Sequence, residues 1–529
     1  MRDFHFPGRS TAHGVNGVAA TSHPAATLAA IDILRAGGNA VDAAIAASAT
    51  LCVVEPQSTG IGGDCFAVYA PGGDMSKAVS VNGSGAAPAN ANVERFVDQG
   101  MSHISVNSVH SVTVPGAIAA WDQMLRDHGT MSFDQVFKTA IDYAEDGYVV
   151  SPRVSRDWAG QAERLANDAN ATRVYMPEGR APTRGEIHKN PWLAETLRTI
   201  AAEGRDGFYT GRVAEDIVSY LNSLGGLHAL DDLAAHETEI SAPIQTSYRD
   251  YAISTVPPNN SGITTLIMLN ILEGFDLASL DPHGSARLHL LSEATRLAYN
   301  ARETYVGDPR QADVPMDKLL SKEFADEMRA KIDPAKAMEL DYIRPPGHPD
   351  TIYLSVVDRD RNAISFINSV FYPFGSALVT PNTGISLQNR GAGFRIQPGH
   401  PNCIAPGKRP LHTITPGMLS KDGRCVMPYG VMGGQYQPVG QSQVVTNVVD
   451  FGMDPQEALD MSRSFHFDET CQLERGVSDQ VEGELQALGH TTSRIDAPHG
   501  GGQAIWIDWE NGTLMGGSDP RKDGIALGY

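Results

Sequence analysis

Two segments near the N-terminus have the apolar periodicity of buried helices. Pro24 stands where a helix can begin, and a glycine pair at 37–38 can end it. Between them, apolar residues recur at helical spacing at Leu28, Ile31 and Leu34. Asn39 can cap a second helix, because its side chain can accept hydrogen bonds from the first backbone N–H groups. One side of this second helix is predicted to face the core, and its many alanines predict close packing beneath a sheet.

Strands are predicted where β-branched and aromatic residues alternate or cluster. Residues 66–70 and 78–81 form one predicted pair, separated by a glycine-containing loop. Residues 351–358 and 363–369 form a second pair around a charged turn. The region from 116 to about 332 is mainly helical, and strands dominate after it. The pattern therefore predicts a mixed α/β (α+β) protein.

Composition and charge restrict the partners that the chain can have. Its 529 residues, 41% hydrophobic and 19% charged, can bury a large globular core. The length alone allows two or more domains, but the sequence has no internal repeat, low-complexity tract or clear interdomain linker. The formal charge of −21 argues against nucleic acid and against an anionic membrane surface, so we expect neither as a partner.

The cysteines indicate neither a disulfide framework nor a zinc site. They are few, odd in number and widely spaced, at Cys52, Cys65, Cys403, Cys425 and Cys471. We expect buried thiols, and neither a metal nor another cofactor. Residues 1–17 lack the apolar core of a signal peptide, and no long apolar run occurs, so a cytoplasmic location is expected.

Thr351 stands at a junction that suits a self-cleaving enzyme. A loop rich in proline and glycine, Arg344–Asp350, ends abruptly at this threonine, and a β-branched strand begins at once. A cut before Thr351 would leave a hydroxyl and a free α-amine on one residue, so that the amine could serve as the base for its own hydroxyl. An ordinary hairpin entered from a loop would have the same local sequence.

Several further motifs occur in a fixed order along the chain. They are Gly37–Ala44, Val54–Pro56, Gly60–Asp64, Pro257–Gly262, Asn270–Gly274, Thr351–Asp358, Lys408–Leu411 and Gly433–Gly434. In these motifs the sequence resembles the γ-glutamyltransferase (glutathione hydrolase) family nearly from end to end. The resemblance implies the four-layer αββα sandwich of N-terminal nucleophile hydrolases.

The resemblance also implies a precursor that cleaves itself between Asp350 and Thr351. The large subunit would be residues 1–350 and the small subunit residues 351–529, both forming one compact unit. Relatives of this kind allow a dimer of such heterodimers. The cleavage loop at 344–350 is then a processing loop and not a linker between domains.

The catalytic roles carried over from the family fall on four residues. Thr351 corresponds to the nucleophile, which forms an acyl-enzyme that is resolved by water or by an acceptor amine. Ser369 corresponds to the second hydroxyl, although a strand serine without a role is the alternative. Gly433 and Gly434 correspond to the diglycine whose N–H groups form the oxyanion hole.

The substrate-binding positions depart from the classical family pattern. The segment 82–88 has no arginine, Phe371 occupies the position of an asparagine that binds the α-amine, and His412 and Thr413 replace a pair of serines. A new cation, Arg390, occurs where a glutamine and an acid are expected. A carboxylate without a neighbouring ammonium suits this change, since guanidinium binds carboxylate through two parallel hydrogen bonds. Alternatively, Arg390 makes a structural ion pair and His412 is a structural histidine.

Two enzymatic functions and one non-enzymatic function remain open from the sequence. The first is hydrolysis or transfer of γ-glutamyl groups. The second is hydrolysis of glutaryl amides or other monoamides of small dicarboxylic acids, as in the divergent, cephalosporin-acylase-like branch of the family. The third is an unprocessed, inactive homologue with a binding role. The segment Gly60–Asp64 does not follow a strand, so it predicts a tight glycine turn against the active strand and not a dinucleotide loop.

Overall fold

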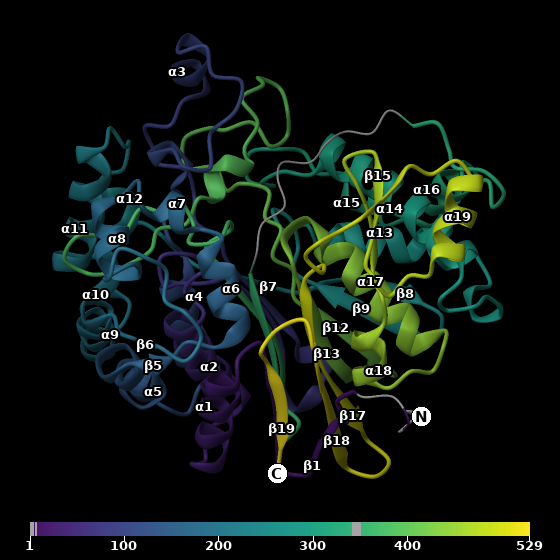
Figure 1. The fold of residues 1–529 in the computed structure, drawn as a ribbon, viewed down its shortest axis with the longest axis horizontal. Coiled ribbons are helices and arrows are strands. Elements are labelled where there is room, and N and C mark those ends of the chain that lie inside the picture. Colours follow the sequence, from purple (N-terminus) through teal and green to yellow (C-terminus); the bar gives the residue numbers. More distant parts are fainter. Residues whose placement is uncertain (1–4, 6–7, 341–350) are drawn as a thin grey trace.

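The computed structural model describes residues 5, 8–340 and 351–529, and it contains two stacked seven-stranded sheets (Figure 1). The first sheet has the order β19 (Ile525–Gly528), β2 (Gly17–Thr21), β10 (Ile352–Asp358), β11 (Ala363–Ser369), β3 (Asp64–Ala70), β4 (Val79–Gly83) and β7 (Glu239–Ser241). The second has the order β1 (Ala12–Gly14), β18 (Thr513–Ser518), β17 (Gly501–Asp508), β13 (Arg424–Met432), β12 (Gly417–Lys421), β9 (Tyr251–Thr255) and β8 (Ile244–Tyr248).

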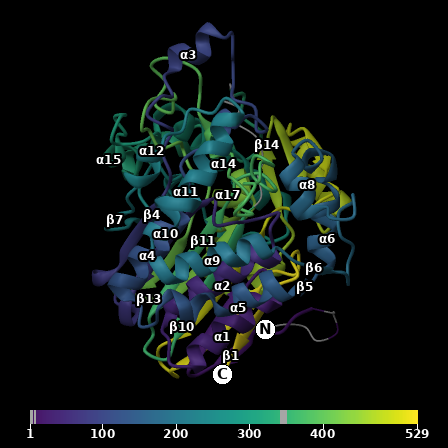
Figure 2. The same cartoon turned by 90° about the vertical axis from the view of Figure 1, so that its left-hand side faces the viewer.

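A layer of helices covers the outer face of each sheet. The layer on the first sheet includes α1 (Pro24–Arg35), α2 (Ala40–Val54), α4 (Ala117–His128), α5 (Phe133–Asp146) and α9 (Pro191–Glu203). Figure 2 shows this layer in front of the strands. The layer on the second sheet includes α13 (Gly262–Leu272), α14 (Ser285–Tyr305), α17 (Gln437–Val449) and α18 (Pro455–Asp460). The arrangement is the four-layer αββα sandwich that the resemblance implies.

Shorter elements surround the four layers. The helices are α3 (Val93–Asp98), α6 (Pro152–Ala159), α7 (Ala162–Leu165), α8 (Ala169–Tyr175), α10 (Asp206–Tyr209), α11 (Gly211–Ser223), α12 (Leu230–Ala234), α15 (Met316–Leu319), α16 (Lys322–Arg329) and α19 (Asp479–Ala487). The strands are β5 (Tyr148–Val149), β6 (Ile187–His188), β14 (Ser464–Phe467), β15 (Thr470–Leu473) and β16 (Thr492–Arg494). Strands dominate the described chain after Thr351, as predicted, and the structure adds three helices there, α17, α18 and α19.

The predicted local elements are present. The N-terminal helix begins at Pro24, and Asn39 caps α2 by accepting hydrogen bonds from the N–H groups of Val41 and Asp42. All of α2 is buried, and not one side only. Its alanines allow this, because their small side chains let α1, α5 and the sheet approach it closely.

Alternation along the strands separates the core between the sheets from the core beneath the helices. In β3, Phe66 and Val68 pack between the two sheets, whereas Cys65 and Ala67 pack against the helices. All five cysteines are buried and free, as predicted. Within the described ranges, none of the helices combines the length and hydropathy that a membrane-spanning segment needs.

Strands from both sides of position 351 interleave in each sheet. In the first sheet β10 pairs with β2 on one side and with β11 on the other, and β11 pairs with β3. In the second sheet β12 pairs with β9, and β18 pairs with β1. This interleaving supports the prediction that the two proposed subunits form one unit. The predicted cleavage loop, Arg344–Asp350, lies outside the described residues.

Candidate active site

Thr351 and Ser369 lie side by side at the open end of the β10–β11 hairpin. The register pairs Ile352 with Asn368, so Thr351, just before Ile352, lies next to Ser369, just after Asn368. The two hydroxyl oxygens are 3.1 Å apart, and both residues are fully buried. The Ser369 hydroxyl also accepts a hydrogen bond of 2.9 Å from the backbone N–H of Phe371. The structure therefore brings together the two hydroxyls that the sequence predicts as nucleophile and partner.

The glycine turn before β3 packs directly against this hairpin. A Cβ atom on Gly63 would lie 2.2 Å from the carbonyl oxygen of Ser369, and one on Gly62 would lie 2.3 Å from that of Ser386. No side chain fits at such distances, so glycine is required for the approach. The turn follows α2 and leads into β3. This confirms the prediction of a tight turn against the active strand.

The diglycine lies at the end of β13, on the sheet that faces Thr351. Across the two sheets, the Ser355 hydroxyl donates to the Pro428 carbonyl at 3.2 Å, and the Tyr353 ring lies against Gly430. A step of two residues along β10 thus matches a step of two along β13. Thr351 lies two residues before Tyr353 and so belongs to the same face of β10, the face that packs against β13.

Gly433 and Gly434 both have positive φ, at 113° and 54°. They form the turn from β13 into the short helix η6 (Gly434–Tyr436). Successive backbone N–H groups in such a conformation can point to one side and bind an anion. These positive φ angles are compatible with the oxyanion-hole role that the family resemblance predicts for the diglycine.

Arg390 is a buried cation whose guanidinium is hydrogen-bonded on only one of its sides. It is fully buried, and its Nη1 donates to the Thr413 hydroxyl at 2.8 Å. Its guanidinium lies over the Phe371 ring, 4.0 Å from the ring centre. Among the described residues, Nε and Nη2 have no hydrogen-bond partner. These two atoms form one edge of the guanidinium plane, which is the edge that a carboxylate binds with both oxygens.

His412 and Asp64 form a buried pair beside Arg390. His412 Nε2 lies 2.9 Å from Asp64 Oδ2, and both side chains are fully buried. Burial and, to a smaller extent, the charge of Arg390 together lower the pKa of His412 to about 3, although Asp64 opposes the shift. His412 is therefore neutral. It donates from Nε2, so Nδ1 is an acceptor, and Nδ1 has no partner among the described residues.

Asp64 is saturated with hydrogen bonds. Oδ1 accepts from the N–H groups of Gly85 and Gly116 and from Gln388 Nε2, at 3.0, 3.1 and 2.9 Å. Burial alone would raise the pKa of Asp64, but these hydrogen bonds, the one from His412 and the nearby guanidinium together lower it. Asp64 is thus ionised and fully occupied. Asp64 lies in one of the sequence motifs, but no role was predicted for it, and Gln388 was not predicted as a site residue.

One other group in the described part of the chain has metal-ligand chemistry. His289, Glu293 and His490 are buried with their donor atoms close together. His289 Nδ1 and His490 Nε2 are 2.7 Å apart and hydrogen-bonded, and Glu293 pairs with Arg296 at 2.9 Å. Because these atoms are occupied by one another and by a cation, we assign them no metal.

Comparisons with known proteins show which family the chain belongs to. The sequence profile described as gamma-glutamyltranspeptidase matches residues 26–529. The chain belongs to the gamma-glutamyltranspeptidase family. It is 38% identical to a glutathione hydrolase-like proenzyme (YwrD) of Bacillus subtilis, over 97% of this chain and 99% of that one. It is 33% identical to an oxamate amidohydrolase proenzyme of Klebsiella pneumoniae, over 97% and 98% of the two chains.

A solved structure has the same fold over the full length. The cephalosporin acylase from Bacillus halodurans superposes with a TM-score of 0.94 at 37% identity, covering 100% of this chain and 99% of that one. The protein is therefore an N-terminal nucleophile hydrolase of the gamma-glutamyltranspeptidase family, similar to its acylase-like branch. Both curated relatives above are proenzymes, whose names imply processing into two subunits.

Proposed function

We propose that Thr351 is the nucleophile of a self-processing amide hydrolase. In maturation, the Thr351 hydroxyl attacks the Asp350 carbonyl, the acyl group moves from nitrogen to oxygen, and water hydrolyses the resulting ester. The cut frees the Thr351 α-amine. The distance of 3.1 Å between the Thr351 and Ser369 hydroxyls supports a role for Ser369 in orienting the nucleophile.

In turnover, the freed α-amine accepts the hydroxyl proton while the Thr351 oxygen attacks the substrate carbonyl. The N–H groups of Gly433 and Gly434 stabilise the resulting oxyanion. Collapse breaks the C–N bond, the leaving amine takes the proton, and an ester on Thr351 remains. Water or a second amine then attacks this ester, passes its proton to the α-amine and releases the acyl group.

We further propose that the acyl group carries a carboxylate and needs no α-amine. The single observation that carries this is the open Nε–Nη2 edge of the buried Arg390. The contacts link this edge to the nucleophile, because the Phe371 ring lies under the guanidinium and the Phe371 N–H binds the Ser369 hydroxyl. Monoamides of short dicarboxylic acids, such as glutaryl amides, have the matching chemistry.

The surroundings of Arg390 argue against dedicated binding of an α-ammonium group. Asp64 is the acid of this cluster, and its oxygens already accept four hydrogen bonds. His412 is neutral and offers an acceptor at Nδ1, which suits a neutral N–H or O–H donor of the substrate. Phe371 contributes an apolar ring where classical members have an asparagine.

Hydrolysis of γ-glutamyl compounds is the second candidate. The observation that favours it is the full-length similarity to a glutathione hydrolase-like proenzyme. Kinetics on glutaryl and γ-glutamyl p-nitroanilides separate the two candidates, because these substrates differ only by the α-amine. We expect kcat/KM for the glutaryl amide to equal or exceed that for the γ-glutamyl amide. A strong preference for γ-glutamyl would mean that other residues bind the amine. Oxamate is a useful third substrate, since it tests the shortest diacid.

A further inference from the structure

The loop before β17 lies in backbone contact with the diglycine. A Cβ atom on Gly433 would lie 2.7 Å from Gly500 Cα, and one on Gly500 would lie 2.2 Å from the Met432 carbonyl oxygen. Gly500 has a positive φ of 60°. The position of Gly500 therefore limits where the backbone of Met432 and Gly433 can lie.

Charged side chains bind both backbone polar groups of His499, the residue before Gly500. The backbone N–H of His499 donates to Glu474 at 3.0 Å, and its carbonyl accepts from Arg463 Nη1 at 2.6 Å. The His499 ring also stacks on Tyr436, the last residue of η6, with ring centres 4.9 Å apart. Two contacts thus connect this loop to the diglycine turn, one before it and one after it.

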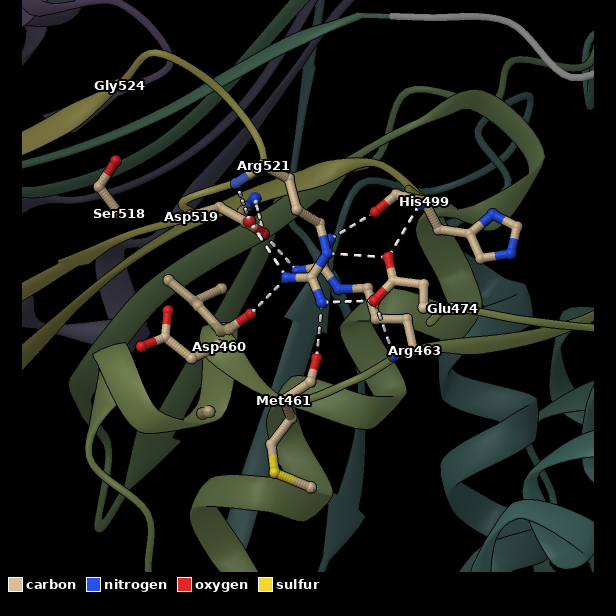
Figure 3. Close-up of polar contacts among 12 residues, drawn as sticks. Asp460, Met461, Arg463, Glu474, His499, Ser518, Asp519, Arg521 and Gly524 are labelled. Atoms are coloured by element: carbon tan, nitrogen blue, oxygen red, sulfur yellow. Dashed lines mark hydrogen bonds and ion pairs between the residues drawn. The ribbon is translucent and has the colours of Figure 1, made fainter. Parts of the chain in front are cut away.

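The charged side chains belong to a buried network of two arginines and two acids (Figure 3). Glu474 accepts from the Arg463 backbone N–H at 3.0 Å and from Arg521 Nε and Nη2 at 2.8 and 2.6 Å. Asp519 pairs with Arg463 and Arg521, and it also accepts from the Gly502 N–H at 2.9 Å. The loop is therefore fixed at His499 and again at Gly502.

The charges of this network balance, so it can exist in the interior. The side chains of Arg463 and Asp519 are 4% and 0% exposed. Burial would raise the pKa of Asp519, but the charges of Arg463 and Arg521 outweigh it and lower that pKa. Arg521 also donates to the carbonyls of Leu459 and Met461, at 2.9 and 2.8 Å. Such a satisfied network is rigid, which suits a positioning role.

We propose that Arg463, Glu474, Asp519 and Arg521 position the oxyanion-binding N–H groups through His499 and Gly500. This inference rests on the proposed function of Gly433 and Gly434. None of the four charged residues needs to touch the substrate. They act as positioning residues, and their effect reaches the reaction through the backbone contact of Gly500 and the stacking of His499 on Tyr436.

Two variants disturb this connection in different ways. Arg463→Lys keeps the charge, but one ammonium cannot replace a guanidinium that reaches the His499 carbonyl and Asp519 from separate nitrogens. Gly500→Ala leaves every charge in place and pushes against the Met432 carbonyl. The control is Arg249→Lys, because Arg249 likewise pairs with an acid, Asp450, and donates to two carbonyls, but it contacts neither the loop nor the diglycine.

The experiment measures kcat and KM per cleaved enzyme, thermal melting, and hydrogen–deuterium exchange of the peptide that covers 431–437. We expect both test variants to lower kcat about 10–100-fold with KM changed less than about threefold, and to speed exchange in that peptide. The control, at a more exposed arginine, should keep wild-type kcat and exchange, and any change in its melting temperature should be smaller. The proposal is overturned if folded test variants keep wild-type kcat, or if both lose their cooperative melt. If the wild-type enzyme hydrolyses no amide, the proposed function fails, and unchanged exchange in the test variants would still refute the positioning role.

Discussion

The open edge of Arg390 leads to the most direct prediction. Replacement by methionine keeps most of the side-chain volume and removes the guanidinium. If Nε and Nη2 bind a substrate carboxylate, the variant loses two charge-assisted hydrogen bonds in a buried site. Such a loss costs about 2–3 kcal/mol, which corresponds to a decrease of about 30–150-fold in kcat/KM.

The stability of the same variant should behave differently from its activity. In the free enzyme, burial lowers the pKa of Arg390 to about 9, and two of its nitrogens have no hydrogen-bond partner among the described residues. An unsatisfied buried donor costs about 1–3 kcal/mol. Removing the guanidinium relieves this cost, but it also removes a positive charge that helps to keep the buried Asp64 ionised, so we expect the melting temperature to change little. A variant that loses activity but not stability indicates that the replaced residue serves binding and not folding.

The assay compares glutaryl p-nitroanilide with pentanoyl p-nitroanilide, which lacks the carboxylate. Wild-type enzyme should prefer the glutaryl substrate, and Arg390→Met should lose that preference while hydrolysing the pentanoyl substrate as before. The matched control is Arg287→Met, because Arg287 is also buried but donates to the Pro282 carbonyl, Thr446 and Asn447. The control should lose stability and keep the preference. If Arg390→Met retains the glutaryl preference, Arg390 does not bind the substrate carboxylate.

Three further predictions test maturation, the glycine turn and pH dependence. Thr351→Ala should remain a single chain without activity on a denaturing gel, and a cleaved Ala variant or a fragment beginning elsewhere would contradict the assignment. Gly63→Ala places a methyl group against the Ser369 carbonyl, so it should slow cleavage and lower kcat at least about tenfold; Gly483→Ala, which meets no atom, should do neither. Burial lowers the pKa of His188 from 6.5 to about 4, so its contribution to stability is present above pH 6.5 and is lost as the pH falls toward 4. His188→Phe should therefore reduce the loss of unfolding free energy between pH 7 and pH 5 by roughly 1–2 kcal/mol, and an unchanged loss in chemical denaturation would contradict this.

The sequence by itself determined the local elements, and its resemblance to the family predicted the nucleophile at Thr351. The capping of α2 by Asn39 and the hairpin that begins at Thr351 depend on neighbouring residues, whose hydrogen bonds and side-chain period can be read along the chain. The glycines at 62–63 could be assigned to a close backbone approach for the same reason. Arg390 was identified as a candidate because it departs from a family pattern, and not because of any local signal.

Only the tertiary structure decided what surrounds these residues. Asp64 meets His412 although 348 positions separate them, and that contact fixes the tautomer of a histidine that burial and the charge of Arg390 keep neutral. The contact between Tyr353 and Gly430, two residues from Thr351 and three from Gly433, arises from the stacking of two sheets. The sequence of a strand does not show which strand of the other sheet it packs against. Its side chains alternate between the two faces in the same way whatever the neighbour is. Burial and charge at the site are properties of that packing, so they could be learned only from the folded chain.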